Sequence, residues 1–135
     1  MSYMSKKSLA PVLPSITEAE WIVMRVLWEG APMTANAVVA ALDGHSEWKP
    51  KTIHTLLRRL SDKGAIAYQK AGREFVFSPQ VNASDCQLAE GRSFLDRVFG
   101  STQLAPMLAA FVEREALSAK EIAELKRILE EASPT

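Results

Sequence analysis

Basic and hydroxyl-bearing side chains recur at helical spacing between residues 48 and 64, in the segment WKPKTIHTLLRRLSDKG. Lysine and arginine can donate hydrogen bonds to guanine acceptors or to phosphates, and threonine offers base edges a hydroxyl and thymine a methyl contact. On a helix these side chains share one arc, which could read the major groove of a DNA duplex. The arc comprises Lys51, Thr55, Arg58, Arg59 and Asp62, with Thr52 at its edge.

An apolar stripe on the opposite side of the same segment would hold this arc outward. Ile53, Leu56, Leu57 and Leu60 recur at i, i+3, i+4 and i+7, which predicts a helix that packs through them against neighbouring helices. A proline suits the first position of that helix, and a glycine suits the position after its end. The expected helix therefore spans residues 50–63.

The elements around this helix predict a winged helix-turn-helix. Helical patterns cover residues 18–29, where Thr17 and Glu20 form a capping box, and residues 35–42. Alternating apolar residues from 66 to 77, interrupted by a glycine turn, predict a β-hairpin with Arg73 at its tip. Lys70 and Arg73 on this wing could hold phosphates or enter the minor groove.

Charge is unevenly distributed along a chain whose formal net charge is zero. Residues 1–80 hold ten Lys or Arg against seven Asp or Glu, whereas residues 81–135 hold six against nine. This distribution favours contact of the front half with a polyanion. A simple solvated helix face is one alternative, and a winged-helix module that contacts only protein is another. The basic arc lacks the aromatic side chains expected of a protein-docking surface.

Several classes of site are excluded by composition. Cys86 is the single cysteine, so no internal disulfide can form, and with only His45 and His54 it cannot supply a zinc-finger ligand set. No nucleophile with a base or carboxylate pair suggests an enzyme, and no cofactor is expected. The N-terminus lacks a signal-peptide pattern and no segment approaches a membrane span, so a cytoplasmic protein is expected.

The back half predicts about three amphipathic helices, with capping boxes at Ser84 with Gln87 and at Ser118 with Glu121. So short a unit buries too little apolar surface to be stable alone, so a partner should cover its stripes; folding back on the front half is the alternative.

The expected domains are a flexible arm (1–15), a winged helix-turn-helix (16–80) and a helical dimerisation region (81–135), in a mainly α fold. The expected interface comprises Phe94, Leu104, Leu108, Phe111, Ile122, Leu125, Ile128 and Leu129.

The segment WKPKTIHTLLRRLSDKGAI, followed by GREFVFSP, closely resembles the penicillinase repressor family, which includes methicillin-resistance and copper-responsive repressors. The resemblance extends through TEAEWIVMRVLW, SFLDRVF and LSAKEIAELKRILEE. It implies a homodimeric bacterial repressor that binds a palindromic operator, here of β-lactamase-type resistance genes. Some members carry a serine where this chain has Lys49, which cannot cap the helix but could contact a phosphate.

The family also implies a switch. In its penicillinase branch, a membrane sensor of β-lactams leads to cleavage before a phenylalanine of the second dimerisation helix, which in MLAAFVERE is the bond between Ala110 and Phe111. Several relatives have asparagine in place of Ala110. Release by a ligand without cleavage is the alternative. The copper branch carries paired cysteines near the C-terminus, which this chain lacks. Cys86, in the first turn of a helix, is either a redox sensor or an inert thiol.

Overall fold

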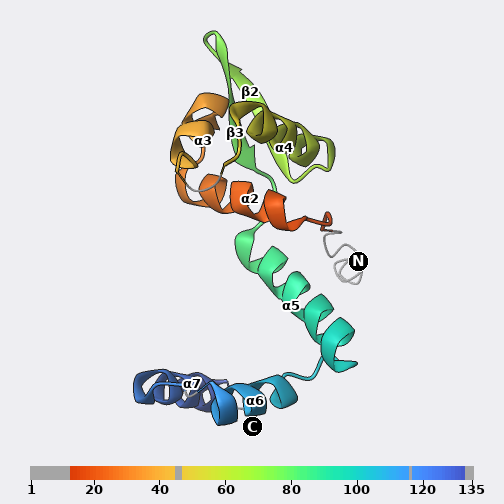
Figure 1. The fold of residues 1–135 in the computed structure, drawn as a ribbon, viewed down its shortest axis with the longest axis vertical. Coiled ribbons are helices and arrows are strands. Elements are labelled where there is room, and N and C mark those ends of the chain that lie inside the picture. The colour runs from red at the N-terminus through yellow and green to blue at the C-terminus, as the bar shows by residue number, and fades with distance from the viewer. Residues whose placement is uncertain (1–12, 45–46, 116, 133–135) are drawn as a thin grey trace, which may run out of the picture. The chain divides into compact units, whose positions relative to one another are not determined.

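The computed structural model of the chain describes residues 13–44, 47–115 and 117–132 (Figure 1). The described residues up to Ala89 form one compact unit, and those from Glu90 onward form a second. Residues 1–12, most of the predicted arm, lie outside the described part. The first unit contains α2 (Glu18–Gly30), β1 (Met33–Thr34), α3 (Ala35–Ala41), α4 (Pro50–Asp62), β2 (Ile66–Ala71) and β3 (Glu74–Pro79).

The predicted hairpin is confirmed as β2 and β3, and β1 adds a third strand to make an antiparallel sheet. Its order is β1-β3-β2, and both Met33 of β1 and Tyr68 of β2 pair with Phe77 of the central strand. β1 is only 2 residues long, so it has no alternating pattern that could reveal it in the sequence. The wing is therefore tied to the segment between α2 and α3 as well as to α4.

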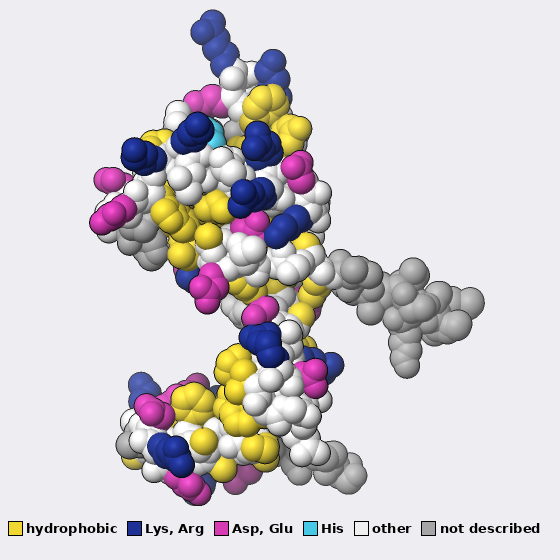
Figure 2. All heavy atoms as spheres, turned by 45° about the vertical axis from the view of Figure 1, so that its right-hand side comes forward, with side chains coloured by type: hydrophobic (Ala, Val, Ile, Leu, Met, Phe, Trp, Pro, Cys, Tyr) yellow, Lys and Arg dark blue, Asp and Glu magenta, His cyan; other side chains and the backbone are white. Residues whose placement is uncertain are grey.

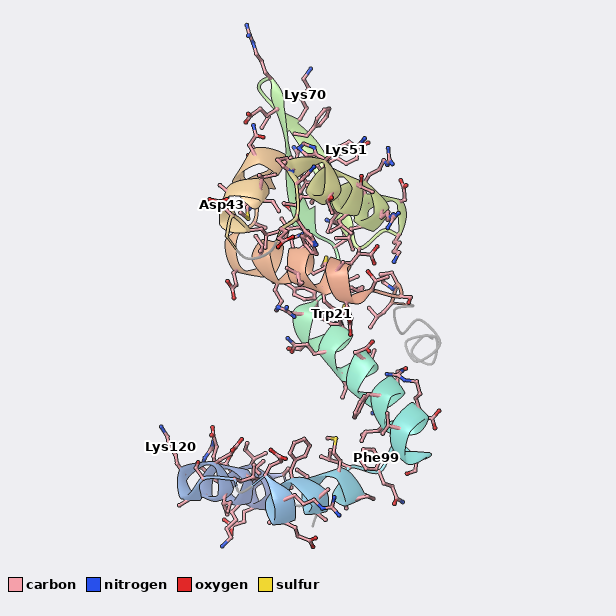
Figure 3. All side chains as sticks on the ribbon, in the orientation of Figure 1. Trp21, Asp43, Lys51, Lys70, Phe99 and Lys120 are labelled. Atoms are coloured by element: carbon pink, nitrogen blue, oxygen red, sulfur yellow. The ribbon has the colours of Figure 1, made fainter. Side chains whose placement is uncertain are left out.

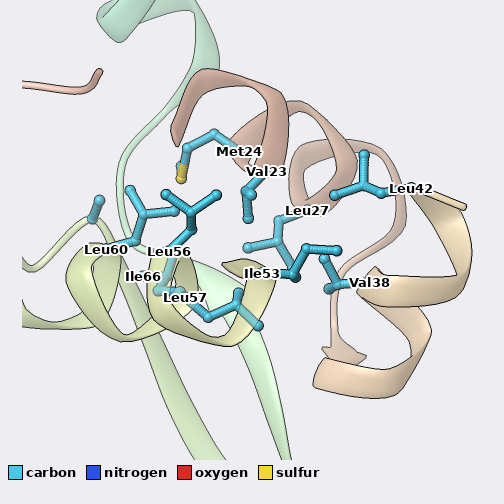
Figure 4. Packing of buried hydrophobic residues seen from close by; sticks show 11 residues of the cluster. Val23, Met24, Leu27, Val38, Leu42, Ile53, Leu56, Leu57, Leu60 and Ile66 are labelled. Atoms are coloured by element: carbon cyan, nitrogen blue, oxygen red, sulfur yellow. The ribbon is translucent and has the colours of Figure 1, made fainter. Parts of the chain in front are cut away.

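The core of this unit lies between α2, α3 and α4 and against the start of β2 (Figure 4). All four residues of the predicted α4 stripe are buried, which confirms the orientation of that helix. Trp48 packs partly buried against the core. The other buried apolar residues of the cluster are Val23, Met24, Leu27, Val38, Leu42, Ala65 and Ile66.

Capping agrees with the sequence pattern at two helices and differs at a third. Thr17 and Glu20 form the predicted capping box of α2. At α7 (Ala119–Glu131), only one of the two hydrogen bonds of the predicted capping box forms among the described residues: the Ser118 hydroxyl accepts the backbone N–H of Glu121. The prediction of a cap at Ser84 was wrong, because α5 (Ala83–Phe99) begins earlier and Asn82 Oδ1 accepts the N–H of Asp85.

The second unit contains most of α5, together with α6 (Ala105–Arg114) and α7. Six of the eight residues predicted for the dimer interface are exposed, and Leu108 and Leu125 are partly buried. Leu95 is the buried apolar residue that α5 contributes here. The described helices include none that is both long enough and apolar enough to span a membrane. The helices of this unit therefore leave much of their apolar surface uncovered by one another.

Candidate nucleic-acid interface

The predicted basic arc lies on the exposed side of α4. Lys51, Arg58 and Arg59 are exposed, as is Thr52, while the opposite stripe of the helix is buried. Figure 2 shows Lys and Arg side chains gathered on one face of the N-terminal unit and at its upper tip. The buried stripe fixes the rotation of α4 about its axis, so its cations face solvent.

The first turn of α4 has no side-chain cap. Lys49 occupies the N-cap position, and its side chain makes no cap hydrogen bond. Pro50 follows in the first turn and has no N–H, so fewer orphan donors are left there. The positive end of the helix dipole and the exposed lysine side chain meet at this point, which favours a nearby anion.

Thr55 differs from the other residues of the arc. It is partly buried, and its hydroxyl donates a hydrogen bond to the backbone carbonyl of Lys51 at 3.0 Å. Such a bond to the preceding turn is common for threonine in helices. The hydroxyl proton is therefore engaged, and Thr55 can offer a partner its methyl group or a hydroxyl lone pair.

The wing carries its cations at and near the tip. Gly72 adopts φ +67°, the left-handed conformation that lets β2 turn into β3, and Arg73 follows it. Both Arg73 and Lys70 are exposed, and Figure 3 shows Lys51 on α4 and Lys70 on β2 within the same unit. The structure thus brings the α4 and wing residues of the predicted site into one compact unit.

Two aromatic residues of the wing and one histidine were not predicted as functional. Tyr68 and Phe75 are 59% and 48% exposed, although the sequence pattern places them in line with apolar residues of the core face. His54 is exposed on α4 and lines two hollows, one shared with Tyr68 and the other with Thr34. The sequence could have indicated an exposed His54, because its position on the helix lies between the buried stripe and the basic arc. Nothing in the sequence distinguishes Tyr68 from a buried strand residue.

An ion pair between buried Glu20 and partly exposed Lys63 holds the end of α4 in place. The carboxylate of Glu20 is 1% exposed and accepts a hydrogen bond from Lys63, which also donates to the carbonyl of Ser15 at 2.7 Å. Burial alone would raise the pKa of Glu20, but Lys63 and the hydrogen bonds of Thr17 outweigh it and lower that pKa. The pair joins the end of α4 to the start of α2.

The described residues show no metal centre, and their single thiol is not activated. No group of three or more His, Cys, Asp or Glu side chains among them could hold a metal ion. Cys86 is buried, and its burial, with the charge of Asp85, raises the pKa of its thiol. The position at the start of a helix does not offset this loss of solvation.

Comparison with known proteins agrees with this geometry. The family model of the penicillinase repressor matches residues 16–131. The chain is 43% identical to the penicillinase repressor of Bacillus licheniformis, over 88% of this chain and 92% of that protein. It is 35% identical to the methicillin resistance regulatory protein MecI of Staphylococcus aureus, over 84% and 92%. The solution structure of the DNA-binding domain of the repressor BlaI matches with a TM-score of 0.50 and 43% identity, covering 55% of this chain and 90% of that domain.

Three helices, the third of which carries an exposed basic arc, and a β-hairpin wing define a winged-helix DNA-binding protein. Such a protein needs no catalytic machinery, and the matched relatives are repressors rather than enzymes. The chain belongs to the penicillinase repressor family, whose members are transcriptional repressors. The resemblance noted in the sequence is thereby confirmed.

Proposed function

We propose that this protein represses transcription by binding a palindromic operator as a homodimer, with α4 in the major groove. The observation that carries the proposal is the pairing of a buried stripe with an exposed arc on α4. Lys51, Arg58 and Arg59 would approach base edges or phosphates, with Thr52 and Thr55 beside them. Lys49 and the wing residues Lys70 and Arg73 would hold the flanking backbone.

The homodimer would form through the second unit. Apolar side chains on α5, α6 and α7 are exposed within one chain, including Phe94 at 40% and Leu129 at 61%. Their burial against a second copy would stabilise the second unit of each chain, because each large apolar side chain removed from water contributes about 1.5 to 3 kcal/mol. A two-fold dimer would then present two winged units to the two halves of a palindrome.

The regulated genes would be of the β-lactamase resistance type, and cleavage would relieve repression. The bond between Ala110 and Phe111 lies inside α6, and both residues are exposed within one chain. A bond in a regular helix fits a protease site poorly, so cutting requires a locally opened state. Cleavage would separate the winged unit from α7, and a sensor-linked protease is the partner that this step requires.

DNA binding is tested by gel shift and fluorescence anisotropy with palindromic duplexes from the promoters of the genes that neighbour this one. Lys51→Ala and Arg59→Ala should each weaken binding by roughly 1 to 3 kcal/mol if a base contact is lost. Lys120→Ala, an exposed lysine on α7, is the matched control and should bind like the parent. Unchanged affinity in both α4 variants would rule out this helix as the reader.

Cleavage is tested in cells exposed to a β-lactam, from which the repressor is recovered and its fragments are weighed by mass spectrometry. The expected products end at Ala110 and begin at Phe111. Phe111→Leu keeps a large apolar side chain in α6 and removes the phenylalanine, so this variant should stay intact. Intact parent protein on a derepressed operator, or a cut elsewhere, would contradict this part of the proposal and favour release by a ligand.

A further inference from the structure

A hollow of about 440 Å³ lies between α4 and the wing, beside the basic arc. Its aromatic side comes from β2 and β3, where Tyr68 meets Phe75 edge-on with ring centroids 5.3 Å apart and lies 6.0 Å from Phe77. The volume falls in the range of small-molecule sites, about 300 to 1,000 Å³. Tyr68 and Phe75 are about half exposed, so a flat ring placed against them would remove apolar surface from water.

The α4 side of the hollow carries four polar side chains, His54, Arg58, Ser61 and Asp62, and the last three could bind the polar groups of a ligand. Arg58 and Asp62 are one turn apart and of opposite charge, yet within the described part of the chain they form no ion pair. Ser61 lies between them, and its Oγ is buried with no hydrogen-bond partner among the described residues. A buried hydroxyl without a partner costs free energy, which a ligand would recover after rotation about χ1.

We propose that this hollow binds a small aromatic zwitterion, an aromatic amino acid or a close analogue. The ring lies against Tyr68 and Phe75, the carboxylate accepts hydrogen bonds from Arg58 and Ser61, and the ammonium group pairs with Asp62. An aromatic anion would place its negative charge near that of Asp62. An aromatic cation would place its positive charge near that of Arg58. Only a zwitterion complements both charges at the spacing of one helical turn.

Occupancy would weaken operator binding, because Arg58 cannot serve the ligand and the DNA together. This effect rests on the proposed function, whereas binding of the ligand itself does not. Coupling of this kind is reciprocal, so operator DNA would weaken ligand binding by the same factor. The hollow would thus give the repressor an input that needs no cleavage.

Calorimetry and two-dimensional NMR on the full chain without DNA test the site, with L-tryptophan as the probe. Tryptophan should shift the amide signals of α4 and the hairpin. Indole-3-propionate, which lacks the ammonium group, and tryptamine, which lacks the carboxylate, should each bind roughly tenfold more weakly. Ser61→Ala should lower tryptophan affinity by a similar factor.

Asp62→Asn provides the sharper comparison. In this variant tryptophan and indole-3-propionate should bind with nearly equal affinity, since the group that distinguishes them is gone. Asp96→Asn, the same change on α5, should leave the parent's preference intact. Equal binding of the three probes to the parent, no signal shifts at millimolar tryptophan, or shifts confined to α6 and α7 would overturn the proposal.

Operator binding is then measured with and without saturating tryptophan. The parent should lose affinity several-fold, and the Asp62→Asn variant should need roughly tenfold more tryptophan for half of that loss. Tryptophan that binds at α4 without changing operator affinity would overturn the coupling through Arg58. Absence of operator binding even without tryptophan would instead count against the proposed function. The ligand titration without DNA would still test the hollow.

Discussion

Glu20 and Lys63 form an ion pair, with 2.5 Å between Oε1 and Nζ, that fastens the end of α4 to the first turn of α2. The Glu20 side chain is almost fully buried, whereas the Lys63 side chain is 31% exposed. Glu20 also closes the capping box of α2 through its hydrogen bond to the N–H of Thr17. One buried carboxylate therefore holds both the start of α2 and the end of the helix that presents the basic arc.

Lys63→Met should destabilise the N-terminal unit by about 2 to 3 kcal/mol at pH 7. This value lies below the roughly 3 to 5 kcal/mol of a fully buried pair because Lys63 is partly exposed. Tryptophan fluorescence in urea reports this unit alone, since Trp21, Trp28 and Trp48 all belong to it. Glu20→Gln is the control: it removes the charge that Lys63 would otherwise neutralise and should cost less than Lys63→Met. An equal or larger loss in Glu20→Gln would show that the buried, unpaired carboxylate is not what makes Lys63→Met costly.

The same pair predicts acid sensitivity of the parent. The pKa of Glu20 is lowered from its ordinary value of 4.5, so folding favours the ionised form. Its contribution is therefore complete above about pH 4.5 and is lost as pH falls through the lowered folded pKa. Urea unfolding at pH 7 and at pH 3 to 4 should show the difference between parent and Lys63→Met shrinking in acid. A constant difference would show that the charge of Glu20 is not the cause.

Arg73→Ala tests the wing. If Arg73 contacts only phosphate, its loss should weaken binding to all duplexes about equally and flatten the slope of log affinity against log salt by about one unit. Anisotropy titrations at several salt concentrations, on operator and on scrambled duplex, measure both quantities. Loss of discrimination between the two duplexes would place Arg73 on a base edge in the minor groove instead.

Leu129→Asp tests assembly without disturbing the fold of one chain, because Leu129 is 61% exposed there. Burial of the introduced carboxylate in a dimer would be costly, so the dimer dissociation constant should rise by at least roughly tenfold. Ala123→Asp adds the same charge to an exposed position elsewhere on α7 and should leave assembly unchanged. Sedimentation velocity at micromolar concentrations separates these outcomes, and a monomeric parent would contradict the proposed dimer.

Trp28→Phe tests a contact that ties α2 to the segment before α5. Trp28 Nε1 donates to the carbonyl of Val81 at 3.0 Å, and its loss leaves that acceptor unpaired. The expected cost is about 1 kcal/mol, read from thermal unfolding by circular dichroism. Trp21→Phe removes a neighbouring indole that makes no such bond in the described part of the chain, and it should cost less. Equal losses would assign the effect to packing of the two rings.

The sequence by itself determined the features that depend on residues three or four positions apart. The capping box of Thr17 and Glu20, the buried stripe of α4 and the glycine turn of the wing are all local, so their residue types suffice to predict them. The orientation of Lys51, Arg58 and Arg59 followed from the stripe, because one buried face fixes the opposite one. The family resemblance rested on the same segments.

Tertiary structure alone decided the features that depend on distant partners. Lys63 finds Glu20 43 residues away, and Trp28 finds Val81 53 residues away, at separations that no local pattern records. The strand β1 exists because β3 offers it unpaired backbone groups. Tyr68 and Phe75 continue the apolar alternation of the hairpin but extend past the edge of the core, so they are exposed beside α4 and form a wall of the hollow there. An alternating pattern records which side chains share a face of a strand, and the packing of the other elements decides how far along the strand that face is covered.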